Sequence, residues 1–241
     1  MIVQGKQNKG LLYLIPTIIS NNTETNVLPR QIIDTIKNLK YYLVENQRSA
    51  RRFFKRVLPE IKLDEIKISV LDKKTKREDI KVLISPLLNG DDLGILSDSG
   101  CPGIADPGSL VVEKAHEMEI KVIPLVGPSS ILLSIMASGF NGQHFTFHGY
   151  LPIEDNLLKQ KLKQIETEIF KSGAAQIFIE TPYRNQRLLK ALTTHLNNNV
   201  KLCIASNLTG KNEYIKTMSI SKWREATIEF HKVPAVFLLG K

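Results

Sequence analysis

Short apolar runs alternate with amphipathic segments through the first half of the chain. The apolar runs are 11–17, 41–45, 93–97 and 120–126, and each has the length and flanking turn residues of a buried strand. Apolar residues at helical spacing predict helices over 28–39, 46–58, 75–89 and 109–119. Pro86 is expected to bend the third of these helices. This alternation predicts an α/β domain whose parallel or mostly parallel sheet is covered by helices on both faces.

The second half of the chain also alternates predicted helices and strands, in a different order. The predicted elements are a helix over 127–139, a helix over 154–171, strands at 175–180 and 201–206, a helix ending near 196, and a closing pair of strands at 214–219 and 235–239. Turn residues cluster around 140–145, between the first of these helices and the next extended segment. We therefore predict two α/β domains, 1–140 and 145–241.

The composition is that of an ordinary globular protein with a basic excess. Hydrophobic residues make up 42% and charged residues 24% of the 241 residues, which is enough to bury real cores. The formal net charge is +9, from 33 Lys and Arg against 24 Asp and Glu. The positive field that this charge creates attracts phosphate-rich partners such as RNA. The alternative is that a Lys-rich surface only keeps the protein soluble.

Two further features predict a cytoplasmic protein. Cys101 and Cys203 are too few for a disulfide framework and lack metal-ligand spacing. The first ten residues lack the apolar core of a signal peptide, and no apolar run approaches the roughly 20 residues of a membrane helix. We expect no membrane partner and no metal site.

The segment Ser97–Gly108, SDSGCPGIADPG, follows a predicted buried strand directly. Its glycines leave backbone N–H and C=O groups accessible, and ligands of parallel sheets bind beyond the carboxyl ends of the strands. The segment lacks the Gly-Lys-Ser/Thr ending of a phosphate loop and carries Asp98 and Asp106 but no cation. That balance disfavours a polyphosphate and suits a ligand with positive charge, such as a sulfonium amino acid. A purely structural Gly-Pro turn is the alternative.

The predicted helix over 46–58 is strongly basic. Its arginines Arg48, Arg51 and Arg52 are candidates for contacts with RNA phosphates. The alternative is an amphipathic helix with a solvated basic face.

A series of motifs, in order along nearly the whole chain, resembles the tetrapyrrole methylase superfamily and, within it, the ribosomal RNA small subunit methyltransferase I family. The motifs are GLLYLIPT, SDSGCPGIADPG, VIPLVGPSSILLSIMASGF, FHGYLP, FIETPYRNQRLL and ASNLTG. The resemblance implies two α/β domains with S-adenosylmethionine in the cleft between them, in a homodimer. It also implies methylation of a cytidine ribose 2′-hydroxyl in small-subunit ribosomal RNA. Other members of the superfamily methylate corrins or porphyrins, so a small-molecule acceptor is an alternative.

Position within these motifs suggests the residues that contact the donor. In the loop they are Asp98, Ser99, Gly100, Cys101, Gly103 and Ile104, and in the following helix Ser129 and Ser130. Helix capping is the alternative role for Ser129. Glu180 ends a buried strand, where a carboxylate needs a partner such as Arg184 or RNA-facing residues nearby. It either has a catalytic or cofactor role or forms an ion pair that fixes the turn. A ribose hydroxyl would gain from a general base, which the sequence does not identify, and the displacement needs no metal.

Three motifs depart from the family pattern. The family's PTPIGNL has Ser20 in place of its glycine, its E-D-T-R has Asn46 in place of its aspartate, and its R-E-L-T reads Ser206–Thr209, SNLT. The donor side therefore resembles the family more closely than the acceptor side does. A non-catalytic RNA-binding or ribosome-binding homologue is accordingly a second hypothesis.

Overall fold

The computed structural model describes residues 9–230 and 232–241, in two compact units, Met1–Pro128 and Ser129–Lys241. The expectation of no signal peptide rests on residues 1–10, and of these only Lys9 and Gly10 lie within the described ranges. In the part of the chain that the structure describes, no helix is both long and apolar enough to cross a membrane.

The first unit is built on a five-stranded sheet in the order β3-β2-β4-β1-β5. The strands are β1 (Leu12–Ile15), β2 (Tyr41–Val44), β3 (Lys67–Val70), β4 (Leu93–Leu96) and β5 (Val122–Pro124). Every neighbouring pair is parallel, so the carboxyl ends of all the strands lie along one edge. The predicted parallel sheet is present, and β3, an edge strand with mostly exposed side chains, is the strand that the sequence pattern missed.

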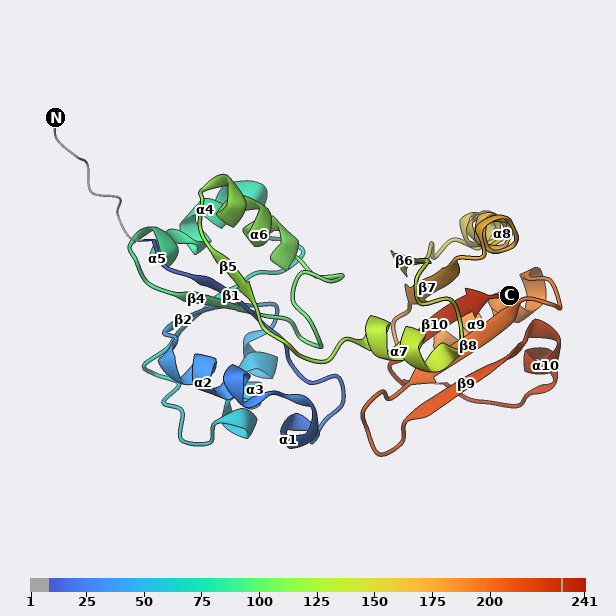
Figure 1. The fold of residues 1–241 in the computed structure, drawn as a ribbon, viewed down its shortest axis with the longest axis horizontal. Coiled ribbons are helices and arrows are strands. Elements are labelled where there is room, and N and C mark those ends of the chain that lie inside the picture. The colour runs from blue at the N-terminus through green and yellow to red at the C-terminus, as the bar shows by residue number, and fades with distance from the viewer. Residues whose placement is uncertain (1–8, 231) are drawn as a thin grey trace. The chain divides into compact units, whose positions relative to one another are not determined.

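Helices cover both faces of this sheet (Figure 1). The helices are α1 (Glu24–Val27), α2 (Arg30–Asn38), α3 (Gln47–Val57), α4 (Ile80–Leu83), α5 (Ser85–Leu88) and α6 (Gly108–Glu117). One core forms where α2 and α3 bury residues such as Ile32 and Phe54 against the sheet. A second core on the opposite face includes Ile84 and Val111. Two separate cores on the two faces are what a doubly wound sheet requires.

The predicted helix over 75–89 is broken into short pieces. A 3₁₀ turn, Arg77–Asp79, leads into α4, and Ile84 (φ −92°, ψ 5°) separates α4 from α5. Pro86 accounts for the break, because it lacks the N–H that would continue the hydrogen-bond ladder of α4, whereas it is tolerated in the first turn of α5. The single helix was therefore a wrong prediction, although its apolar stripe is buried as expected.

The second unit contains a mixed five-stranded sheet in the order β6-β7-β10-β8-β9. The strands are β6 (Phe145–Tyr150), β7 (Ala175–Ile179), β8 (Lys201–Ser206), β9 (Tyr214–Ser219) and β10 (Ala235–Gly240). Only β6 and β7 pair in parallel, and the other pairs are antiparallel. One face buries a core with α8 (Asp155–Ser172), α9 (Asn185–His195) and α10 (Ile220–Glu225).

The helix α7 (Ser130–Ser138) belongs to the second unit. It packs on strands β8, β9 and β10, and Thr217 Oγ1 donates a hydrogen bond of 2.8 Å to the Ser138 carbonyl. The two units of the structure therefore meet along the chain between Pro128 and Ser129, whereas the sequence pattern predicted the domain boundary near 140–145. The turn residues that suggested the later boundary instead separate α7 from β6 within the second unit.

We predict that Gly127→Ala destabilises the protein. A Cβ at this position would lie 2.2 Å from Pro16 Cβ and 2.6 Å from Pro16 Cγ, so the ends of β1 and β5 would have to separate. We expect a loss of about 1–3 kcal/mol in the free energy of unfolding, measured by denaturant titration. Gly142→Ala is the control, because its Cβ would meet nothing within 4 Å. Equal stabilities of the two variants would contradict this packing.

Candidate functional site

The loop after β4 is fastened to the end of β1 by the backbone and side chain of Thr17. The Thr17 N–H donates to the Gly100 carbonyl at 2.9 Å, and Thr17 Oγ1 donates to the Ser97 carbonyl at 3.1 Å. Thr17 and Ser97 are both buried. The loop is therefore held at the carboxyl edge of the sheet, where ligands of parallel sheets bind.

Asp106 organises the second half of the loop. Its Oδ1 accepts the backbone N–H groups of Gly103 at 2.8 Å and Gly108 at 2.7 Å, which closes a turn before α6. Gly103 has φ of +82°, a conformation that favours glycine, and its missing Cβ leaves open space around it. Ile104, next to it, is 52% exposed. The loop thus presents backbone and one apolar side chain to the outside.

Three carboxylates gather at this edge of the sheet. Burial raises the pKa of Asp98 and of Asp106, in the latter against the opposing effect of its hydrogen bonds to Gly108 and Gly103. Burial also raises the pKa of Glu45, whose Oε1 accepts the Asp98 N–H at 3.1 Å. The negative charges of Asp106 and Asp98 raise the pKa of Glu45 further. A cationic ligand at this edge would therefore be favoured electrostatically.

Cys101 is half-buried in the same loop. Its Sγ donates to the Pro128 carbonyl at 3.4 Å, and burial raises the pKa of the thiol. A raised pKa keeps the thiol protonated and a poor nucleophile. The geometry supports the interpretation of Cys101 as a small residue in the wall of the site.

The basic helix is α3, and its amino end follows β2 at the same edge of the sheet. The side chains of Arg48, Arg51 and Arg52 are exposed, and none of these guanidinium groups makes a hydrogen bond or ion pair with any other described residue. Phe53 and Phe54 on the opposite side of the helix are buried. The amphipathic helix and the free cationic face are thus both present.

Ser129, Ser130 and Glu180 belong to the second unit. Ser129 is the N-cap of α7, and its Oγ accepts the Leu132 N–H at 3.4 Å. Ser130 is the first residue of the helix and is half-buried. The capping role considered for Ser129 is therefore present, and donor contacts of both serines remain predictions.

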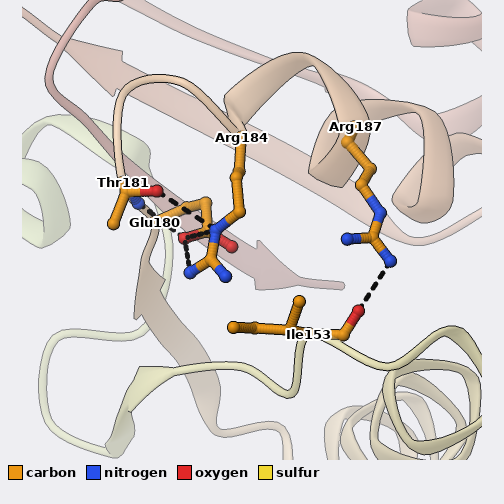
Figure 2. A network of polar contacts seen from close by, with 5 residues as sticks. All are labelled: Ile153, Glu180, Thr181, Arg184 and Arg187. Atoms are coloured by element: carbon orange, nitrogen blue, oxygen red, sulfur yellow. Dashed lines mark hydrogen bonds and ion pairs between the residues drawn. The ribbon is translucent and has the colours of Figure 1, made fainter.

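Glu180 lies in the ion pair that the sequence suggested as one of two roles (Figure 2). Its Oε1 accepts from Arg184 Nη2 at 2.5 Å, from Arg184 Nε at 3.0 Å and from the Thr181 N–H at 2.6 Å. The Glu180 side chain is 7% exposed. These contacts fix the turn between β7 and α9, and a cofactor contact of Glu180 remains a prediction.

Sequence reasoning missed Thr17 and Glu45 as parts of this site and did not count Asp106 among the donor contacts. The available signal was topological, because residues that follow β1, β2 and β4 must meet where parallel strands end together. No group of three or more His, Cys, Asp or Glu side chains in residues 9–230 and 232–241 could hold a metal ion.

Curated relatives match the chain over most of its length. A ribosomal RNA small subunit methyltransferase I from Buchnera aphidicola subsp. Schizaphis graminum is 31% identical over 206 residues, covering 86% of this chain and 68% of that protein. The enzyme of the same name from Borrelia garinii subsp. bavariensis is 28% identical, over 96% of this chain and 99% of that protein. The chain belongs to the ribosomal RNA small subunit methyltransferase I family.

Solved structures agree on the fold. The methyltransferase CobJ aligns with a TM-score of 0.64 at 16% identity, over 96% of this chain and 94% of that chain. A uroporphyrin-III C-methyltransferase from Thermus thermophilus, complexed with S-adenosylhomocysteine, aligns with a TM-score of 0.57 at 15% identity, over 96% of this chain and 98% of that chain. No family model matches the chain. The predicted fold, and the predicted class of S-adenosylmethionine-dependent methyltransferase, are confirmed.

Two of the three departures from the family motifs, those at Asn46 and Ser20, keep a regular local structure. Asn46 is the N-cap of α3, and its Oδ1 accepts the N–H groups of Arg48 at 2.9 Å and Ser49 at 3.2 Å. An aspartate would make the same bonds, so the substitution preserves the helix start. Within 16–22 only Asn22 has a positive φ, 60°, so Ser20 adopts a backbone conformation open to any residue. Neither change disrupts the fold around the site.

We predict that Asp106→Asn stabilises the protein progressively as pH rises. The Asp106 pKa in the folded state is raised above its unfolded value of about 3.9, so the wild type loses stability as pH rises through the interval between the two. Asparagine keeps the acceptor for Gly103 and Gly108 and does not titrate. The free energy of unfolding of D106N minus that of the wild type should therefore increase across this interval, as measured by denaturant titration at several pH values. A difference independent of pH would contradict the buried charge.

We also predict that Glu180 and Arg184 are coupled in stability. Arg184→Met leaves a nearly buried carboxylate without its partner and should lower the free energy of unfolding by about 1–3 kcal/mol. The double variant E180Q/R184M should lose less than the sum of the two single variants. Thermal and denaturant unfolding of the four proteins measures this. Additive losses would mean that the pair does not fix the turn.

Proposed function

We propose that this enzyme holds S-adenosylmethionine at the loop Ser97–Gly108 and transfers its methyl group to small-subunit ribosomal RNA. The observation that carries the proposal is the loop itself, which Thr17 fastens to the carboxyl edge of a parallel sheet. The proposed donor contacts in the loop are those suggested by the motifs, Asp98, Ser99, Gly100, Cys101, Gly103 and Ile104.

The electrostatics of the loop fit this donor. S-adenosylmethionine carries a sulfonium and an ammonium group, and the edge of the sheet carries Glu45, Asp98 and Asp106, all with raised pKa values. A bound cation would favour their ionised forms and would gain attraction from them. A polyphosphate would meet the same carboxylates with repulsion. These three carboxylates therefore suit a cationic cofactor better than a nucleotide phosphate.

The acceptor is proposed from the relatives and from charge. The relatives named above are methyltransferases of small-subunit ribosomal RNA, and this chain has a net charge of +9. The free arginines Arg48, Arg51 and Arg52 on α3 offer contacts to phosphates. By family resemblance the acceptor atom is a cytidine ribose 2′-hydroxyl, and the active form is a homodimer in the cytoplasm.

The mechanism is an in-line displacement in which positioning supplies much of the acceleration. The donor, when bound, supplies an electrophilic methyl group on a positively charged sulfur. The chain's part is to orient it: Thr17 fixes the loop, the Gly103 turn allows close approach of backbone, and Asp98 and Glu45 lie at the edge of the sheet beside it. Cys101 stays a protonated thiol and takes no part as a nucleophile.

The proposal predicts methyl transfer to small ribosomal subunits from a strain that lacks this gene. Purified protein and labelled S-adenosylmethionine should label small-subunit RNA, and mass mapping should place the label on one ribose. Binding of the donor without any transfer to these subunits or their RNA would contradict the proposed acceptor.

The site of donor binding is tested separately with Ile104→Ser. Ile104 is 52% exposed, so the substitution should leave the free energy of unfolding unchanged within about 0.5 kcal/mol. Loss of its apolar contact should weaken S-adenosylhomocysteine binding several-fold in calorimetry. The control is Val82→Ser, which replaces a more exposed apolar residue of α4, at 73%, outside the proposed site. Equal affinities of I104S and V82S would place the donor elsewhere.

A further inference from the structure

A cavity of about 150 Å³ lies wholly within the first unit, beside the loop. Three segments form its walls: the stretch after β1, one side of α3, and the end of β4 with Ser97 and Asp98. Its apolar lining includes Ile18, Val44 and Phe53. Neither the family motifs nor the proposed donor contacts assign a role to this cavity as a whole.

The polar lining of the cavity has two opposite signs. Arg52 and Arg56 of α3 supply positive charge, and Asp98 supplies negative charge. Arg56 is held in place, because its Nη1 donates to Asn21 Oδ1 at 2.9 Å and lies 3.5 Å from Glu24 Oε1. The Arg52 guanidinium makes no hydrogen bond or ion pair with any other described residue. One fixed and one free guanidinium thus face the same space as a carboxylate.

The size of the cavity limits what can enter it. Pockets for whole cofactors or drug-sized ligands measure roughly 300–1,000 Å³. A space of about 150 Å³ cannot enclose the whole of S-adenosylmethionine or of a tetrapyrrole, and it suits a fragment such as one sugar. Among such fragments, the ligand must present an anionic group to Arg52 and a hydrogen-bond donor to Asp98.

A ribose within an RNA strand meets these requirements. Its 3′-phosphodiester is anionic and matches the planar fork of an arginine. The adjacent 2′-hydroxyl can donate to a carboxylate, and the sugar carbons can lie against the apolar lining. A free polyphosphate would be repelled by Asp98, and DNA lacks the hydroxyl.

We propose that this cavity is the acceptor subsite, in which Arg52 binds the 3′-phosphodiester of the target ribose and Asp98 accepts a hydrogen bond from its 2′-hydroxyl. The proposal rests on the proposed function and specifies how the acceptor is held. Arg56 gives a second, pre-positioned positive charge. Asp98 is itself one of the proposed donor contacts, so the subsite places the acceptor hydroxyl next to the donor.

The charge test compares two neighbouring arginines of α3. Arg52 lines the cavity and Arg51 does not, although both side chains are exposed and make no hydrogen bond or ion pair among the described residues. Arg52→Gln should raise the KM for small ribosomal subunits about tenfold or more and leave the KM for S-adenosylmethionine unchanged. Arg51→Gln removes the same charge and should raise the subunit KM by less than about threefold, its share of the general attraction. Arg52→Lys should fall between R52Q and the wild type.

A filling variant tests the cavity without changing charge. Ser49 lines the cavity from α3 and its side chain is exposed. Ser49→Leu should lower kcat/KM for subunits about tenfold, while thermal stability and S-adenosylhomocysteine affinity stay at the wild-type values. Unfolding curves of every variant confirm that the fold is intact.

Several outcomes would overturn the subsite. Equal effects of R51Q and R52Q would show that the arginines act only as a diffuse basic face. A raised KM for S-adenosylmethionine in R52Q would assign the cavity to the donor. Equilibrium binding of small-subunit RNA to the same variants separates the two proposals. One outcome would overturn the proposed function but keep the subsite. In that outcome the wild-type protein binds RNA, R52Q and S49L bind it more weakly, and no methyl group is transferred.

Discussion

The hydrogen bonds of Thr17 are the constraint on which the site depends. Strand β1 lies next to β4 in the sheet, and Thr17 ties the residues after β1 to the carbonyls of Ser97 and Gly100 after β4. These bonds fix a loop that has little regular structure of its own. Because the loop is fixed, Asp98 can face the cavity of α3 while Gly103 and Ile104 remain open to a ligand. One tether thereby sets both the proposed donor side and the proposed acceptor side.

Much of the fold follows from hydrophobic periodicity. Four of the five parallel strands of the first unit coincide with continuous apolar runs. The reason is clearest for the inner strand β4, which is buried along its whole length, because strands buried on both faces exclude polar residues. The edge strand Lys67–Val70 escaped detection since most of its side chains are exposed. The stripe over 75–89 predicted the right buried face but the wrong continuity, because Pro86 acts on the backbone and periodicity reports only side chains. The domain boundary moved for a similar reason: α7 packs on the second sheet, and that contact is tertiary.

The candidate site, like the fold, could be predicted from the sequence only in part. The loop Ser97–Gly108 could be found from its glycines and carboxylates, and family motifs suggested its ligand. The partners Thr17 and Glu45 are distant in sequence and come together only through strand order. The structure also changes the interpretation of a departure from the family pattern. Asn46 reads as a lost carboxylate in sequence, whereas in the structure it is a helix cap that an amide fills equally well.

Hydrogen–deuterium exchange of the full chain, with and without saturating S-adenosylhomocysteine, tests the central claim most directly. Bound product is expected to slow exchange in peptides spanning Ser97–Gly108, because backbone groups of this tethered loop would contact the ligand. Calorimetry on the same sample establishes saturation. Saturated protein whose Ser97–Gly108 amides exchange at the same rate as in the free protein would contradict the assignment of this loop as the donor site.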